Sequence, residues 1–406
     1  MTYARRFVSR PLRSLVVTRT LPGAMGGGND LRRLAIARSL AALGPVTVFG
    51  LGRGGPAPTS EPGRDRLEWR CSTDVEAARA PVGSEMTTAI ALGDSPFAPR
   101  PSAVATAELL EVTTEFEPDL VVVGGLDLAH YATVLRPRTA QLVVDLDYEQ
   151  ARATVELAQA DPNRRRALLW RHAASLVARQ ETELVRMVDQ VWLSADTDVE
   201  HLTTLAGSSV HVAVIPNTIE PHTYPRAARS DPSALVFPAR FDFWPNEDAA
   251  RTLVDEIVPR LDEVQLCLVG QAPPPWLVAR RDARVTVTGP VPDVRPYLAA
   301  AAAMPIPLRA GAGTRFKALE AFAVGLPVVS TAKGVEGLGL VDGVHYLRAE
   351  STDEFVTALD HARHDSTIAR RCITEARSLV EREFSSIALD RAVSRALTTT
   401  GLASGH

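Results

Sequence analysis

The stretch from Met304 to Leu340, MPIPLRAGAGTRFKALEAFAVGLPVVSTAKGVEGLGL, constrains the fold more than any other part of the sequence. Its first apolar residues predict a strand, and the pattern from Arg315 to Val324 predicts a helix with Thr314 as its N-cap. Gly325 ends that helix, and a second strand follows directly. A strand, a helix and a strand in this order are typical of a parallel α/β sheet.

The first turn of this predicted helix carries two cations. Arg315 and Lys317 lie where the helix dipole is positive, which is unfavourable for a cation unless an anion is bound there. The preceding loop contains Gly311 and Gly313, whose backbone N–H groups can form a phosphate cradle together with the two cations. Glu320 follows Lys317 by one turn on the same face, where it can accept hydrogen bonds from a ribose diol. The alternative interpretation is a solvated helix face that follows a tight turn.

Lysine is confined to this stretch. The chain has 44 Lys and Arg residues, and its lysines are Lys317 and Lys333. Lysine offers a compact charge to a phosphate, whereas arginine offers a planar fork. The placement favours an anion site here, although two residues can also cluster by chance.

The stretch resembles the nucleotide-sugar-binding motif of family-4 glycosyltransferases with the GT-B fold. It is most similar to a bacterial subgroup whose motif reads approximately PLRxGxGTRxKxLEAxAxGxPVVSTxxGxEGL. Elsewhere, HVAVIPNTIEP resembles the family's V-x-V-x-P-N-G turn, and DQVWLSADTDVEHL loosely resembles its D-x-V-x-x-x-S element. The resemblance implies an α/β protein of the GT-B class, in which two Rossmann-like doubly wound parallel-sheet domains face a central cleft.

The resemblance also implies a set of donor-binding residues. Arg240 occupies the position of an arginine that contacts the donor diphosphate in the family, and Asn246 replaces a lysine that is common nearby. The backbone around Val291 would meet the nucleobase, and the glycines before the first helix would face the phosphates, with a plain turn as their alternative. The residues and the resemblance together predict this donor-binding set: Gly27, Gly28, Arg240, Val291, Arg309, Gly311, Gly313, Thr314, Arg315, Lys317 and Glu320.

Acidic residues follow a predicted strand in the first half of the chain. The strand from Gln141 to Val144 leads into DLDYEQ, and ligands bind doubly wound sheets at the carboxyl ends of their strands. Many family members have a histidine near the position of Asp147, which here can accept a hydrogen bond or a proton from an acceptor hydroxyl. We therefore predict an acceptor side made of Asp145, Asp147 and His130. The alternatives are helix capping by either aspartate and a packing role for His130.

A second departure from the family concerns a pair of glutamates in the donor motif. Ala312 occupies the position of the first glutamate, which touches the donor sugar in the family, so that only Glu320 remains. The identity of the sugar is therefore unconstrained. Glu336, in the second glycine turn, is either a helix-starting carboxylate or a sugar contact.

At 406 residues the chain is long enough for two domains. Its net charge of −4 argues against a nucleic-acid partner, and its dispersed cysteines indicate neither a disulfide framework nor a zinc site. The sequence shows no membrane span and no signal peptide, which predicts a cytoplasmic protein. The arginines between Met1 and Arg13 indicate either a frayed terminus or weak peripheral contact with the inner face of a membrane.

The sequence therefore predicts an acceptor-binding domain (residues 1–225), a nucleotide-sugar-binding domain (226–375) and a C-terminal helix that crosses back to the first domain (376–406). The resemblance implies a retaining transfer of a sugar from a nucleoside-diphosphate sugar to a hydroxyl of an unknown acceptor, with Asp147, Arg240 and Lys317 as catalytic residues. No metal and no cofactor are expected, because no DxD motif is present where a metal would be needed. The alternatives are a non-catalytic nucleotide-sugar-binding subunit and a GT-B epimerase.

Overall fold

The chain forms two compact units in the computed structural model, which describes residues 11–22, 28–52, 66–74, 76–79, 83–97, 101–207, 209–229, 231–311, 313, 315–364 and 367–402. Unit 1 comprises Met1–Thr218 and Ser386–His406, and unit 2 comprises Ile219–Ser385. The boundaries thus lie after residues 218 and 385, not after 225 and 375. They are displaced because the Ile219 N–H donates to the Phe384 carbonyl oxygen (2.8 Å), so that the chain enters and leaves unit 2 at the same place.

Unit 1 is built on a seven-stranded sheet with the order β3-β2-β1-β4-β5-β6-β7. All of its strand pairs are parallel. Its strands are β1 (Ser14–Thr20), β2 (Val46–Gly52), β3 (Leu67–Cys71), β4 (Leu120–Gly124), β5 (Gln141–Asp147), β6 (Gln190–Leu193) and β7 (Val212–Val214). Its helices include α1 (Gly28–Leu43), α2 (Gly83–Ala91), α3 (Ala103–Phe116), α4 (Ala129–Leu135), α5 (Gln150–Ala160), α6 (Arg164–Met187), α7 (Asp196–Ala206) and α14 (Ser386–Thr399).

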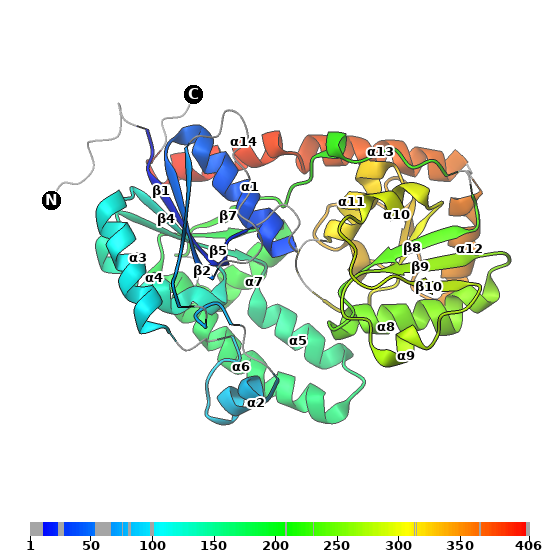
Figure 1. Ribbon diagram of the computed structural model, residues 1–406, viewed down its shortest axis with the longest axis horizontal. Helices are drawn as coiled ribbons and strands as arrows, with labels where there is room; N and C mark the ends of the chain where they lie inside the picture. Colours follow the sequence, from blue (N-terminus) through cyan, green and yellow to red (C-terminus); the bar gives the residue numbers. More distant parts are fainter. Residues whose placement is uncertain are drawn as a thin grey trace. The chain divides into compact units, whose positions relative to one another are not determined.

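Two hydrophobic cores cover the two faces of this sheet. Neighbouring residues of β1 alternate between them: Leu15 and Val17 belong to one core, and Val16 belongs to the other. Helices α3, α4, α6 and α7 supply side chains to the first core, whereas α1 and α14 supply the second (Figure 1). Central strands buried on both faces have continuous apolar sequences. The predicted doubly wound architecture is therefore confirmed for this unit.

Three elements of unit 1 differ from the sequence prediction. Strand β3 and helices α2 and α5 have no counterpart in the elements that the sequence predicts. Helix α5 has no side-chain cap from its own N-cap residue. Instead, the buried carboxylate of Glu181 on α6 accepts the N–H groups of Gln150 and Ala151, both at 2.9 Å. A cap supplied from another helix leaves no local sequence signal.

The arginines near the N-terminus were considered for membrane contact. Arg5, Arg6 and Arg10 lie outside the described residues. Arg13 belongs to unit 1, where its guanidinium stacks on the ring of Phe116, 4.5 Å from the centroid. Within the described part of the chain, no helix is long and apolar enough to cross a bilayer.

Unit 2 contains two short parallel sheets, β10-β9-β8 and β11-β12-β13. A bridge between Leu235 of β8 and Ala303 joins them into one strand order, β10-β9-β8-β11-β12-β13. The strands are β8 (Ala234–Pro238), β9 (Gln265–Val269), β10 (Val285–Val287), β11 (Met304–Ile306), β12 (Val328–Ser330) and β13 (Leu347–Arg348). The helices include α8 (Trp244–Thr252), α9 (Pro275–Val278), α10 (Arg295–Ala300), α11 (Phe316–Val324), α12 (Thr352–Arg363) and α13 (Thr367–Glu383).

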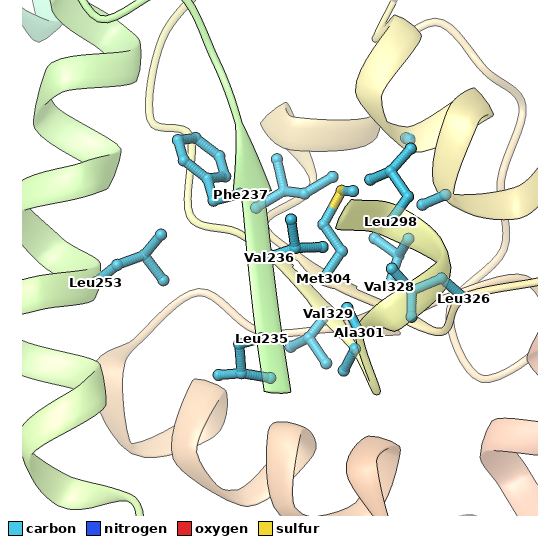
Figure 2. Close-up of a cluster of buried hydrophobic side chains, with 14 of the residues drawn as sticks. Leu235, Val236, Phe237, Leu253, Leu298, Ala301, Met304, Leu326, Val328 and Val329 are labelled. Carbon is cyan, nitrogen blue, oxygen red and sulfur yellow. The ribbon is translucent and has the colours of Figure 1, made fainter. Parts of the chain in front are cut away.

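The core of unit 2 is one continuous cluster around β8, β11 and β12. Figure 2 shows Val236 and Phe237 of β8 beside Met304 of β11, with Val328 and Val329 of β12 next to them. All of these side chains are at most 1% exposed. The core therefore fixes β8 and β11 as neighbours, and it places the loops that follow these two strands at the same edge of the sheet.

Candidate functional site

The strand order reverses direction between β8 and β11 in unit 2. Doubly wound sheets bind ligands at the carboxyl ends of the strands that flank such a reversal. In this unit the position is surrounded by the loop after β8, the loop after β11 and the first turn of α11. Arg240, Arg309, Gly311, Gly313 and Lys317 belong to these three segments. The reversal therefore brings most of the predicted donor-binding set to one edge of the sheet.

Helix α11 begins at Phe316, with Arg315 as an N-cap residue that makes no side-chain cap. The first N–H groups of a helix have no partner within it, and they carry the positive end of the dipole. Gly311 (φ +119°) precedes them in a backbone conformation that other residues rarely adopt. Gly325 ends the helix in the left-handed conformation (φ 80°, ψ 38°), as predicted. Thr314, the predicted N-cap, and Ala312 lie outside the described residues.

Lys317 is partly buried at the start of this helix. Its ammonium group donates to Asn246 Oδ1 (2.9 Å) and lies 4.3 Å from the centroid of the Phe237 ring. Burial lowers the pKa of Lys317 to about 7; the charge of Arg315 acts in the same direction, and Glu320 opposes it. An anion at this position would favour the protonated amine, so the lysine is prepared for a negatively charged ligand.

Glu320 lies one turn further along α11. Its Oε1 accepts a hydrogen bond from the Tyr224 hydroxyl at 3.2 Å. Burial raises the pKa of Glu320 to about 7, whereas the hydrogen bond from Tyr224 and the charge of Lys317 act in the opposite direction. Tyr224 was not predicted as a site residue. It lies 96 positions away in the sequence, directly after a short 3-10 helix (Pro221–Thr223) and next to the predicted domain boundary at residue 225.

Arg315 is 7% exposed, and its guanidinium contacts backbone oxygens. Nη2 donates to the Gly311 carbonyl oxygen (2.7 Å), and Nε donates to the Lys333 carbonyl oxygen (3.1 Å). Lys333 Nζ in turn lies 2.6 Å from the Glu336 carboxylate. Arg315 therefore ties the two glycine turns of the motif together, and its contact with a phosphate stays a prediction.

The other two predicted cations of unit 2 are exposed and paired with neighbouring carboxylates. Arg240 Nε donates to Asp242 Oδ1 (3.0 Å), and Arg309 Nε donates to Asp248 Oδ2 (2.8 Å). The turn that carries Arg240 is held closely from β9, since a Cβ atom at Gly270 would lie 1.9 Å from the Ala239 carbonyl oxygen. Both guanidinium groups reach solvent, where a bound diphosphate can compete with Asp242 and Asp248 for them.

The remaining donor candidates lie in several places. Val291 follows β10 and packs, partly buried, against the core of unit 2. Gly28, which was predicted to lie before the first helix, is the first residue of α1 in unit 1. Gly27 lies outside the described residues. Their contact with a donor stays a prediction.

In unit 1 the aspartates of the predicted acceptor side lie within β5, which extends past the predicted end at Val144. Asp145 is 1% exposed and is held by Arg32 of α1: Nη2 donates to Oδ1 at 2.6 Å, and Nε donates to the same oxygen at 2.9 Å. Asp147 follows a register shift in the strand and has a positive φ of 67°. Asn217 Nδ2 donates to Asp147 Oδ1 at 2.8 Å.

Arg32 organises this cluster, and the sequence analysis did not identify it. It is 3% exposed, and its Nη1 donates to the Ile215 carbonyl oxygen (2.8 Å) and to Asn217 Oδ1 (3.1 Å). Neither aspartate caps a helix; Asp145 neutralises a buried cation instead. Asn217, expected to hold a turn, links Arg32 to Asp147. His130 lies on α4, where its ring contacts that of Tyr131 edge-on and burial lowers the pKa of the imidazole.

Comparisons with known proteins agree with this geometry. Residues 232–365, within unit 2, match the family model of the glycosyl transferases group 1. A comparison with curated protein sequences gives no match. Among solved structures, sucrose-phosphate synthase from Thermosynechococcus elongatus is similar, with a TM-score of 0.74 and 16% identity over 96% of this chain and 99% of that chain.

Two further structures have the same fold. HepE from Anabaena, solved in complex with UDP, has a TM-score of 0.69 at 15% identity over 96% of this chain and 100% of that chain. WaaG, a glycosyltransferase involved in lipopolysaccharide biosynthesis, has a TM-score of 0.62 at 16% identity over 93% and 99% of the two chains. The chain therefore has the GT-B fold, and its second unit carries a segment that matches the group 1 glycosyltransferases.

Proposed function

We propose that the protein is a retaining glycosyltransferase, which moves a sugar from a nucleoside-diphosphate sugar to an acceptor hydroxyl. The observation that carries this proposal is the placement of Lys317 and Glu320 on one helix at the strand reversal of unit 2. A cation beside a helix N-terminus suits a diphosphate, and a carboxylate one turn away suits a ribose. HepE, which has the same fold, has been solved with UDP-glucose, and this supports a donor of that class.

The proposed reaction places most of the stabilisation on the leaving group. The bond between the anomeric carbon and the diphosphate oxygen breaks, and the diphosphate gains negative charge. Lys317 and the N-terminal N–H groups of α11 are fixed before the reaction, so they stabilise this charge without reorganisation, and the exposed Arg240 exchanges Asp242 for the diphosphate. The acceptor oxygen bonds to the same face of the sugar, and its proton passes to the departing diphosphate. The positive charge that the proposed reaction needs comes from these groups.

Asp147 is the proposed hydrogen-bond acceptor for the attacking hydroxyl. Asn217 fixes one of its oxygens, and the positive φ sets the direction of the side chain. Residues held in sparsely populated backbone conformations often belong to functional sites, which supports this assignment. The acceptor in this proposal is a hydroxyl compound.

The test is nucleotide release from UDP-, GDP-, dTDP- and ADP-sugars, measured for the wild type, Lys317→Ala and Glu320→Ala. The proposal expects release of one nucleotide by the wild type and strong loss of release in both variants. Donor-induced thermal stabilisation without release under any acceptor tested would favour the alternative of a non-catalytic nucleotide-sugar-binding subunit. If no donor causes release and no donor stabilises the protein, the proposal is contradicted.

A further inference from the structure

Tyr224 is a residue of unit 2 that contacts the proposed donor site and has no assigned role. It is partly buried, and its hydroxyl donates to Glu320 Oε1 at 3.2 Å. Arg295 makes two contacts that hold Tyr224 in this position. Arg295 Nη1 donates to the Thr223 carbonyl oxygen at 3.0 Å, and its guanidinium lies 5.9 Å from the centroid of the Tyr224 ring. Arg295 of α10 thus contacts both the backbone of Thr223 and the ring of Tyr224.

The hydroxyl of Tyr224 stays protonated at physiological pH, so it can donate a hydrogen bond. Burial and the adjacent Glu320 charge both raise the pKa of the phenol above its ordinary value. The phenol therefore keeps its proton, and its O–H group donates a hydrogen bond to the carboxylate. An ionised carboxylate has about four lone-pair sites, so one bond from Tyr224 leaves acceptor capacity for two further hydroxyls.

We propose that Tyr224 is a positioning residue for the donor: its hydroxyl holds the Glu320 carboxylate in the orientation and ionised form that accept a ribose diol. The inference rests on the proposed function, because it takes a nucleotide as the ligand of this site. It predicts that Tyr224 contributes to the recognition of ribose hydroxyls and does not contribute to the binding of the phosphates or of the base.

The ionised form of Glu320 depends on four neighbouring groups. Lys317 lies on the same helix, Tyr224 lies on the preceding segment, and Asp293 and Arg295 lie at the start of α10. Burial raises the pKa of Glu320 to about 7, and the Tyr224 hydrogen bond opposes this shift. Removal of the hydroxyl would therefore raise the pKa further. A larger fraction of the carboxyl groups would be protonated near neutral pH and would offer fewer acceptor sites to a ribose.

The experiment compares Tyr224→Phe with the wild type in binding of UDP, GDP and ADP and of the 2′,3′-dideoxy counterpart of each. For the base that binds best, we expect the variant to bind the ribonucleotide about tenfold more weakly, as for loss of a hydrogen bond to a charged group. The affinity for the dideoxynucleotide should stay within about twofold, since one hydroxyl lost on the protein side has no ribose partner there. Tyr346→Phe is the matched control, because it removes the same hydroxyl from another tyrosine of the unit 2 core, whose charged neighbours are Asp342, Arg348 and Glu350.

The pH dependence gives a second readout. In the wild type, ribonucleotide affinity should fall as the pH decreases through about 7, where Glu320 takes up a proton. In Tyr224→Phe the midpoint of this loss should lie at higher pH, and the dideoxynucleotide should not show the shift. Equal weakening of both nucleotides would mean that Tyr224 only supports the fold and would overturn the inference. Failure of the wild type to bind any of the six nucleotides would contradict the proposed function itself.

Discussion

The charged residues at the carboxyl edges of the two sheets are used in opposite ways. In unit 1, Arg32 and Asp145 form a buried ion pair that is completed by Asn217. In unit 2, Lys317 and Glu320 each have a neutral hydrogen-bond partner, and burial moves the pKa of both to about 7. The same edge of the same kind of sheet is therefore a fixed scaffold in one unit and a site prepared for ligand charge in the other.

The physical reason lies in what each group loses on burial. A buried charge that has an opposite charge and hydrogen bonds keeps its ionised form, whereas a buried charge with a neutral partner does not. The ion pair in unit 1 stabilises the fold of the ligand-free protein. The charged forms of the groups in unit 2 are stabilised only when a ligand supplies the missing charge. Substitutions should therefore affect stability in unit 1 and ligand affinity in unit 2.

The largest expected effect is on the stability of unit 1. Arg32→Met leaves the Asp145 carboxylate buried without its cation, which we expect to lower the free energy of unfolding of this unit by about 3–5 kcal/mol. Hydrogen exchange should show faster opening of β5 and no change in β8. The double variant Arg32→Met with Asp145→Leu should recover part of the loss, because it removes the uncompensated charge. Equal destabilisation of both units would contradict the comparison.

The next effect concerns ligand affinity in unit 2. Lys317→Ala should weaken UDP binding by about 10- to 100-fold, since a hydrogen bond to a charged group contributes about 1.5–3 kcal/mol. The stability of unit 2 should not decrease, because the variant removes a partly buried cation at the positive end of a helix. Lys333→Ala is the matched control: this lysine is paired with Glu336, and its loss should change UDP affinity by less than about threefold. Calorimetry measures both affinities.

A smaller effect should appear in the pH dependence. Only the protonated form of Lys317 attracts the diphosphate, and the pKa of Lys317 in the free protein is lowered to about 7. UDP affinity should therefore fall as the pH rises above about 7, by at most about tenfold per pH unit. Lys317→Arg keeps its charge throughout this range, so its affinity should show no such fall, whatever its absolute level. A fall of the same size in both proteins would assign the dependence to another group.

The sequence predicted the parts of the site whose signals are local. Lys317, Glu320 and Gly325 lie within one turn or one helix of each other, and helix spacing and dipole arguments apply to them directly. Arg32 and Tyr224 were missed because their partners are distant in the sequence: Arg32 pairs with a residue 113 positions away, and Tyr224 with one 96 positions away. An arginine in a helix and a tyrosine in a turn are ordinary until the fold shows what they touch.

The same reason explains the outcome for the fold. The parallel strands of both units have apolar runs that can be read directly, and the doubly wound architecture follows from their alternation with helices. The extension of β5 to Asp147 was missed because polar residues that follow an apolar run usually indicate that a strand has ended. Only the buried partner on α1 explains why Asp145 can lie within the strand.

The smallest expected effect on stability distinguishes the two aspartates of β5. Asp147→Asn should lower the free energy of unfolding by at most about 1 kcal/mol, because asparagine tolerates a positive φ and keeps an oxygen that can accept from Asn217, while the lost charge lies 3.8 Å from Arg32 Nε. Asp145→Asn should cost several times more, since it removes the charge opposite Arg32.

The proposed role of Asp147 predicts the reverse order for activity. Asp147→Asn should leave UDP binding unchanged and lower the rate of transfer to an acceptor, because an amide is a poorer acceptor of a hydroxyl hydrogen bond than a carboxylate. Turnover of the donor with and without acceptor, measured alongside hydrogen exchange of β5, separates the two effects. If Asp147→Asn transfers the sugar at the wild-type rate, Asp147 belongs to the scaffold with Asp145, and the difference between the two units becomes complete: unit 1 would then contribute only fixed charges at this edge.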